Sequence, residues 1–184
     1  GSYCKFTTGI EGAQRTKQCK QMNSEAYKQP HLKTHHKVAR VVDGDGLFVY
    51  DVFTKKEIEI RLLGIDAPEL KRCKKLIQDE RETHLPGQLL MELGQHSFKY
   101  LSSLAPKDTN ISFLTESANS TDPYGRTLAY VFLPDGTCLN EEMIRSGYAK
   151  PFDIYFCSQL SYYQQLAIFA KGEQRGNYSL CLRY

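Results

Sequence analysis

Two pairs of acidic residues lie beside predicted strand ends and could together bind a hard divalent cation. One pair is in the turn Asp43-Gly44-Asp45-Gly46, and the other is Asp66 and Glu69, separated by a proline-containing loop. Cations such as Ca²⁺ prefer oxygen ligands, so carboxylates from separate loops, together with water, would make an open site. Taken alone, the Asp-Gly pairs are equally typical of a hairpin turn. The second acidic pair favours a metal site.

Two arginines add a second kind of chemistry. Arg61 lies in a predicted strand, and Arg126 ends the segment Asp122-Pro123-Tyr124-Gly125-Arg126, where Pro and Gly shape a turn that could aim the guanidinium into a shared cleft. Either arginine alone could be structural or solvated. Two guanidinium groups beside carboxylates and a cation, however, suit phosphodiester cleavage, because bidentate donors neutralise the charge that builds up on the phosphoryl oxygens.

Length and composition predict one globular domain. The chain has 184 residues, of which 41% are hydrophobic and 24% are charged, within the ordinary range for folded proteins. No apolar run approaches the ~18 residues of a membrane span, so we expect a soluble protein without a membrane partner.

The basic charge is concentrated at the start of the chain. Residues 1–40 carry eight lysines and arginines against two glutamates, whereas the rest of the chain has a net charge of −3. We interpret residues 1–36 as a basic N-terminal extension, irregular or loosely packed, and residues 37–184 as the domain. The extension could hold a polyanion through counterion release, or it could be a solvated tail.

Six cysteines are present, without a CxxC pair or the His/Cys spacing of a zinc site. We therefore expect no structural zinc. The even number permits disulfides in an exported protein, but the sequence does not determine their pairing.

Alternation of apolar and polar residues predicts five strands. In the segment 57–62, for example, Ile58, Ile60 and Leu62 share one face and Arg61 lies on the other. The strands are expected over residues 37–42, 47–53, 57–62, 110–116 and 126–133. Short strands interrupted by a helix match an α+β fold, the five-stranded OB-fold β-barrel, whose face and loops commonly bind oligonucleotides or oligosaccharides.

About three α-helices are expected around this barrel. The first begins at Pro86, ends before Pro106, and carries His96 on its predicted inner face; the second runs from an N-cap at Asn140 to Ser146, and the third follows a cap at Ser158 and ends at Gly172. Residues 71–86 are dense in charge and predict a solvated loop.

The order of these motifs resembles the thermonuclease family, whose type member is staphylococcal nuclease. The resemblance runs from about Lys37 to Ser179 and rests on the following segments: Val41-Val42-Asp43-Gly44-Asp45, Ile60 to Glu69, Asp122 to Tyr130, Leu139-Asn140-Glu141 and Gly147-Tyr148-Ala149-Lys150. It implies that Asp45, Asp66 and the backbone carbonyl of Ala67 bind Ca²⁺, with Glu69 reaching the metal through water.

The resemblance also implies catalytic roles for three residues. Arg61 and Arg126 would clamp the scissile phosphate, and Glu69 would orient or deprotonate the attacking water. Tyr124 and Tyr155 would contact the substrate. The chain departs from the family pattern at Asp153, which occupies the position of one of two nucleotide-contacting tyrosines.

The combined interpretation is a Ca²⁺-dependent nuclease. It would act on DNA and RNA with little sequence preference, favour single strands, and leave 3′-phosphate and 5′-hydroxyl ends. We expect a monomer that is extracellular or periplasmic, its export signal having been removed. The alternative is a non-catalytic OB-fold module that binds single-stranded nucleic acid. Arg61, Glu69 and Arg126 discriminate between the two, because a pure binder has little use for a carboxylate that repels phosphate.

Overall fold

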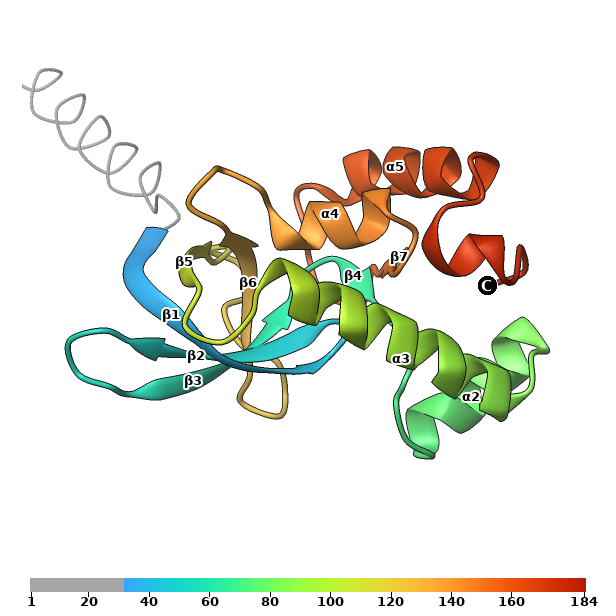
Figure 1. Cartoon of the computed structure of the whole chain (residues 1–184), viewed down its shortest axis with the longest axis horizontal. Helices are drawn as coiled ribbons and strands as arrows, with labels where there is room; N and C mark the ends of the chain where they lie inside the picture. Colours follow the sequence, from blue (N-terminus) through green and yellow to red (C-terminus); the bar gives the residue numbers. More distant parts are fainter. Residues whose placement is uncertain (1–31) are drawn as a thin grey trace, which may run out of the picture.

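The computed structural model describes residues 32–184 and contains a closed five-stranded barrel (Figure 1). Its strand order is β1-β2-β3-β6-β5, with β3 and β6 parallel and the other neighbouring pairs antiparallel. The five strands are β1 Leu32–Asp43, β2 Gly46–Asp51, β3 Glu57–Leu62, β5 Asn110–Leu114 and β6 Thr127–Phe132. The predicted OB-fold barrel is therefore confirmed.

Strand β1 begins earlier than its predicted start at Lys37. It pairs with β5 through Leu32–Lys37 and with β2 through His36–Asp43, and three irregularities in register bend it between these partners. Residues 32–36 were expected to be irregular because most of their side chains are polar, but backbone pairing with β5 does not require apolar alternation. Residues 1–31 of the predicted extension lie outside the described residues.

The core fills the barrel with the apolar faces of its strands. The fully buried strand residues include Leu47, Val49, Ile60 and Leu128. Met143, from the helix over Leu139–Arg145, packs into the same cluster. Truncating a leucine in such a core to alanine costs about 2–5 kcal/mol. This packing holds the strand ends that carry the acidic residues and the arginines.

Residues 32–184 contain four α-helices, one more than expected. They are α2 Lys74–Thr83, α3 Gly87–Leu104, α4 Leu139–Arg145 and α5 Leu160–Gly172, followed by the 3₁₀ helix Gly176–Ser179. The additional helix, α2, occupies the predicted solvated loop and lies against α3 (Figure 1). Leu76 and Ile77 are its only apolar residues and only Leu76 is buried, so the apolar stripe that marks most helices in a sequence is too short to recognise here. None of the helices over these residues is both long and apolar enough to cross a membrane.

Three expected helix details are wrong. The buried face of α3 comprises Leu90, Leu93, Ser97 and Leu101, with Gly87 and Gly94, so His96 is exposed rather than packed in the core. Cys138 and Gln159, not Asn140 and Ser158, occupy the N-cap positions of α4 and α5.

Asn140 is instead a buried link between the barrel and α4. Its side-chain amide donates to the carbonyl oxygens of Leu63 and Ala129, both at 2.9 Å, and its Oδ1 accepts from the Val131 N–H at 3.0 Å. Because Ala129 and Val131 belong to β6 and Leu63 directly follows β3, this one side chain fixes the helix relative to the barrel.

A second, two-stranded sheet joins β4 Ile65–Asp66 to β7 Lys150–Pro151. The pairing of Asp66 with Lys150 places the chain after β7, including Phe152 and Tyr155, beside the loop that follows β4. This small sheet brings together segments that are about 85 residues apart in the sequence.

Candidate active site

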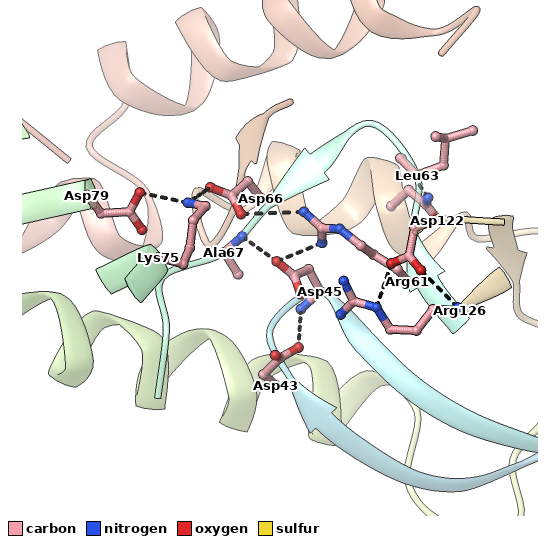
Figure 2. A network of polar contacts seen from close by, with 11 residues as sticks. Asp43, Asp45, Arg61, Leu63, Asp66, Ala67, Lys75, Asp79, Asp122 and Arg126 are labelled. Carbon is pink, nitrogen blue, oxygen red and sulfur yellow. Dashed lines mark hydrogen bonds and ion pairs between the residues drawn. The ribbon is translucent and has the colours of Figure 1, made fainter. Parts of the chain in front are cut away.

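A cavity of about 240 Å³ contains every side chain that the sequence proposed for chemistry or substrate contact. The predicted residues that line it are Asp45, Arg61, Asp66, Glu69, Tyr124, Arg126 and Tyr155. Asp43, the other carboxylate of the predicted acidic turn, lines it too, although the resemblance assigned it no role, and Lys75 and Phe152 line it without having been predicted. Segments from across the barrel therefore meet in one cavity, and Figure 2 shows the network of polar contacts among its charged side chains and their neighbours.

The turn between β1 and β2 sets the position of Asp45. Asp43 Oδ1 accepts from the Asp45 N–H at 3.1 Å, and Asp45 Oδ2 accepts from the Ala67 N–H at 3.0 Å. A Cβ on Gly44 would lie 2.6 Å from the Cβ atoms of both Ala67 and Ser97, so only glycine allows the turn to approach this closely. The first acidic turn is thereby fixed against the loop that carries the second acidic pair.

Arg61 is buried between two carboxylates at the end of β3. Its Nη1 lies 3.1 Å from Asp45 Oδ2 and its Nη2 lies 3.5 Å from Asp66 Oδ1 (Figure 2). The guanidinium also stands over the ring of Phe152, 4.9 Å from the centroid. Burial alone would raise the pKa of Asp45, but the charge and hydrogen bond of Arg61, with further hydrogen bonds to the carboxylate, lower it overall. Asp45 is therefore an ionised carboxylate held in a dry environment.

Asp66 is also paired with a lysine from α2. Lys75 Nζ lies 3.0 Å from Asp66 Oδ2 and 2.6 Å from Asp79 Oδ1, so one ammonium bridges two carboxylates (Figure 2). Burial and the charge of Asp45 raise the pKa of Asp66, although Lys75 and Arg61 act in the opposite direction. The pKa of Asp66 is still raised overall, so Lys75 and Arg61 do not fully offset its burial and the repulsion from Asp45.

Glu69 sits on a loop that presses against α3. A Cβ on Gly94 would lie 2.6 Å from the Glu69 carbonyl oxygen and 2.7 Å from that of Pro68, so the helix backbone directly supports this loop. Burial, followed by the charges of Asp45 and Asp66, raises the pKa of Glu69 to about 7. A carboxylate with this pKa can accept a proton near neutral pH.

Arg126 is positioned by Asp122 within one tight turn. Asp122 Oδ1 accepts from the backbone N–H groups of Tyr124 and Arg126, both at 2.9 Å, and Oδ2 accepts from Arg126 Nε at 2.6 Å. Because only Nε is engaged by a described residue, the terminal nitrogens of the guanidinium remain available to a ligand in the cavity. Tyr124 stands at the rim with 83% of its surface exposed.

The site's donor chemistry fits a hard divalent cation. Asp43, Asp45, Asp66 and Glu69 bring four carboxylates to the cavity, whereas Arg61 and Lys75 supply only two cationic partners. Burial and the charge of Asp45 raise the pKa of Asp43 to about 8. This crowding of oxygen donors is what a cation would relieve. Within residues 32–184, no group of three or more His, Cys, Asp or Glu side chains is already arranged to hold a metal ion.

The residues missed by the sequence analysis carried different signals. Asp43 was not missed, because it belonged to the recognised acidic turn, but its proximity to Glu69 depends on the fold. Lys75 was one of several lysines in a segment taken for a solvated loop, and no local pattern separated it from Lys74. Phe152 could have been suspected only from its place two residues after the Lys150 motif.

Comparison of the sequence with those of known proteins finds relatives that are named as endonucleases. The chain is 33% identical over 121 residues to an uncharacterized endonuclease of Escherichia coli O157:H7, covering 66% of this chain and 63% of that protein. It is 30% identical to the uncharacterized protein MJ1439 of Methanocaldococcus jannaschii, covering 71% of this chain and 65% of that protein. Endonuclease YhcR of Bacillus subtilis is 29% identical and covers 76% of this chain, but only 11% of YhcR is matched.

The chain thus spans less than two thirds of the length of these relatives. Residues 59–178 match the family model described as Staphylococcal nuclease homologue, a region that includes Arg61, Asp66, Glu69 and Arg126 and begins after Asp45. Because this match covers more than half of the 184 residues, the chain belongs to the staphylococcal nuclease homologue family.

Proposed function

We propose that this protein is a Ca²⁺-dependent nuclease that hydrolyses phosphodiester bonds of DNA and RNA. The observation that carries the proposal is the convergence of four carboxylates and the guanidinium groups of Arg61 and Arg126 on one cavity. The endonuclease names of the relatives from Escherichia coli and Bacillus subtilis support the same reaction class.

The two arginines would act on the phosphate. Arg61 is held rigidly by Asp45 and Asp66, whereas Arg126 is aimed by Asp122 and keeps its terminal nitrogens free of described partners. Two such groups on opposite sides of a phosphoryl group would neutralise the charge on its equatorial oxygens. Because both are ordered before substrate arrives, little reorganisation is required during the reaction.

Glu69 would orient the attacking water and accept its proton. Its pKa of about 7 in the metal-free protein makes it a base suited to neutral solution. Asp45, Asp66 and the carbonyl of Ala67 would hold Ca²⁺, with Glu69 reaching it through water. The cation, when bound, would supply Lewis-acid chemistry at the phosphoryl oxygens.

Aromatic side chains at the cavity, one exposed and two partly buried, favour a single-stranded substrate. Tyr124 is 83% exposed at the rim, and Tyr155 lies beside Phe152 with ring centroids 6.1 Å apart. Bases stack on aromatic rings with little sequence preference, but only when they are unpaired. The 3′-phosphate and 5′-hydroxyl products follow from the family resemblance.

All the side chains proposed for catalysis and metal binding come from one chain, so the proposed reaction needs no second copy, and we propose a monomer. An extracellular or periplasmic location remains a proposal that rests on the family resemblance. The four cysteines in the described part, Cys73, Cys138, Cys157 and Cys181, are free thiols and lend it no support. Cys4 and Cys19 lie outside the described residues.

A cleavage assay tests the function. Labelled single-stranded DNA and RNA would be incubated with Ca²⁺ or with EGTA, using wild type, Glu69→Gln, and the exposed control Glu92→Gln. We expect cutting by wild type and by the control only with Ca²⁺, and a loss of at least 100-fold in Glu69→Gln. Undiminished cutting in EGTA or by Glu69→Gln would reject the mechanism. Tight binding without cutting would favour the non-catalytic binding module.

A further inference from the structure

The lysine at the acidic site belongs to the additional helix. Lys75 is the second residue of α2, and its ammonium is the only lysine nitrogen among residues 32–184 that contacts a proposed metal ligand. Its side chain is 33% exposed, whereas those of its partners Asp66 and Asp79 are 14% and 16% exposed. This is a partly buried ion-pair triad rather than a surface contact.

The position of Lys75 is defined by packing as well as by charge. The next residue, Leu76, is fully buried and forms a small cluster with Leu85 and Leu90. Asp79 lies one helical turn further along and holds the ammonium at 2.6 Å. Because α2 is anchored on α3, the lysine is presented to Asp66 by a supported helix.

The contact places a positive charge where the proposed cation needs a carboxylate. Lys75 Nζ is 3.0 Å from Asp66 Oδ2, and Arg61 Nη2 is 3.5 Å from Asp66 Oδ1, so both oxygens of this ligand already face a cationic group. A divalent ion bound to Asp66 must share or displace the ammonium, and the two positive charges repel each other in a partly desolvated site.

We propose that Lys75 is a resident counter-ion that competes with the divalent cation for Asp66 and so weakens metal binding. The inference rests on the proposed metal site and extends it to a residue of the additional helix. In the metal-free protein Lys75 offsets part of the acidic repulsion; in the metal-bound protein the same charge is unfavourable. Lys75 is thus a positioning residue that sets the metal concentration at which the site fills.

A purely structural role makes a different prediction. If Lys75 only held α2 in place, neutral substitution would loosen the helix and leave Ca²⁺ affinity unchanged or weaker. Lys74 provides the matched control, because it lies on the same helix and is exposed, outside the cavity. Lys75→Arg preserves the charge and should preserve the competition.

The experiment is calorimetric titration of the full chain with Ca²⁺ alone at pH 8, without nucleic acid. We expect Lys75→Gln and Lys75→Met to bind Ca²⁺ on the order of tenfold more tightly than wild type, since loss of a neighbouring unit charge acts directly on the ion. Lys75→Arg and Lys74→Gln should remain within about threefold of wild type. The rise in melting temperature on adding Ca²⁺ gives a second measure of affinity in the same variants.

The outcomes separate this inference from the proposed function. Binding by wild type with no tightening in the two neutral variants overturns the role of Lys75 but leaves the metal site intact. Tightening in Lys75→Gln and Lys74→Gln alike also overturns it, because a general charge effect would then suffice. Absence of Ca²⁺ binding in wild type and in both neutral Lys75 variants refutes the metal site and the inference together.

Discussion

Asp122 allows the contribution of Arg126 positioning to be separated from the stability of its turn. The Asp122 side chain is fully buried and accepts three hydrogen bonds, two from backbone N–H groups through Oδ1 and one from Arg126 Nε through Oδ2. Asp122→Asn keeps an oxygen for the backbone groups but turns an amide N–H toward Nε, so that two donors face each other. Asp122→Ala removes all three acceptor contacts.

The expected losses follow from these contacts. A hydrogen bond to a charged group contributes about 1.5–3 kcal/mol. For the bond from Arg126 Nε to Asp122 we use the lower end of this range, because water can solvate the guanidinium once it is released. We therefore expect Asp122→Asn to lower the free energy of unfolding by about 1–2 kcal/mol and Asp122→Ala by about 3 kcal/mol. Both should reduce kcat by on the order of 100-fold, because either change releases the guanidinium from its aimed position. The two variants should thus differ in the free energy of unfolding but lose the same share of kcat.

Urea unfolding and initial cleavage rates on a single-stranded oligonucleotide with Ca²⁺ measure the two effects. Asp135→Asn is the matched control, because Asp135 also closes a turn, accepting from the Thr137 N–H at 2.9 Å, but lies outside the cavity. A kcat for Asp122→Asn within threefold of wild type would refute the argument that Asp122 positions Arg126 for catalysis.

Three further variants or treatments probe the fold and the metal. Asn140→Ala should lower the free energy of unfolding, measured in urea, by about 3 kcal/mol, since three backbone groups lose a buried partner. A decrease of less than about 1 kcal/mol would contradict the linking role of Asn140. Burial would raise the pKa of Glu116, but hydrogen bonds from Ser158 and Tyr130 hold it below its ordinary 4.5. The stability advantage of wild type over Glu116→Gln should therefore be present above pH 4.5 and disappear as the pH falls below it, and an advantage independent of pH from 7 to 3 would count against this. EGTA should lower the melting temperature of wild type but not that of Asp45→Asn, measured by calorimetry.

Alternation in the sequence predicted the strands well but not the burial of their ends. Segment 57–62 forms β3 with the expected bounds, and Arg61 lies on the face opposite Ile60 as expected. The period of two assigns a side chain to a face, not to solvent or interior. Arg61 is buried because Asp66, from β4, and Phe152, after β7, cover that face, and this covering depends on long-range pairing between β4 and β7.

Helix α2 was missed because its stability does not come from an apolar stripe. Leu76 is its only buried residue, and side-chain pairs one turn apart, such as Lys75 with Asp79 and Gln78 with Glu82, add about 0.2–0.5 kcal/mol each. A dense run of charges is compatible with either a solvated loop or such a helix. The packing of Leu76 on Leu85 and Leu90 favours the helix over the loop, and local composition does not reveal this contact.

The residues that the motifs identified and those that they missed differ in one physical respect. Asp45, Asp66, Glu69, Arg61 and Arg126 adjoin turns or strand ends whose local sequence is distinctive, whereas Lys75 acquires its role only from where the fold places α2. Four carboxylates in one partly dry cavity oppose folding, and the charges of Arg61 and Lys75 offset only part of that repulsion. The fold must hold the cluster together by other means, and the Asn140 link and the barrel core do so away from the cavity. Changes in that framework should therefore alter stability more than chemistry, whereas Asp122→Asn should alter chemistry more than stability and neutral changes at Lys75 should alter metal affinity.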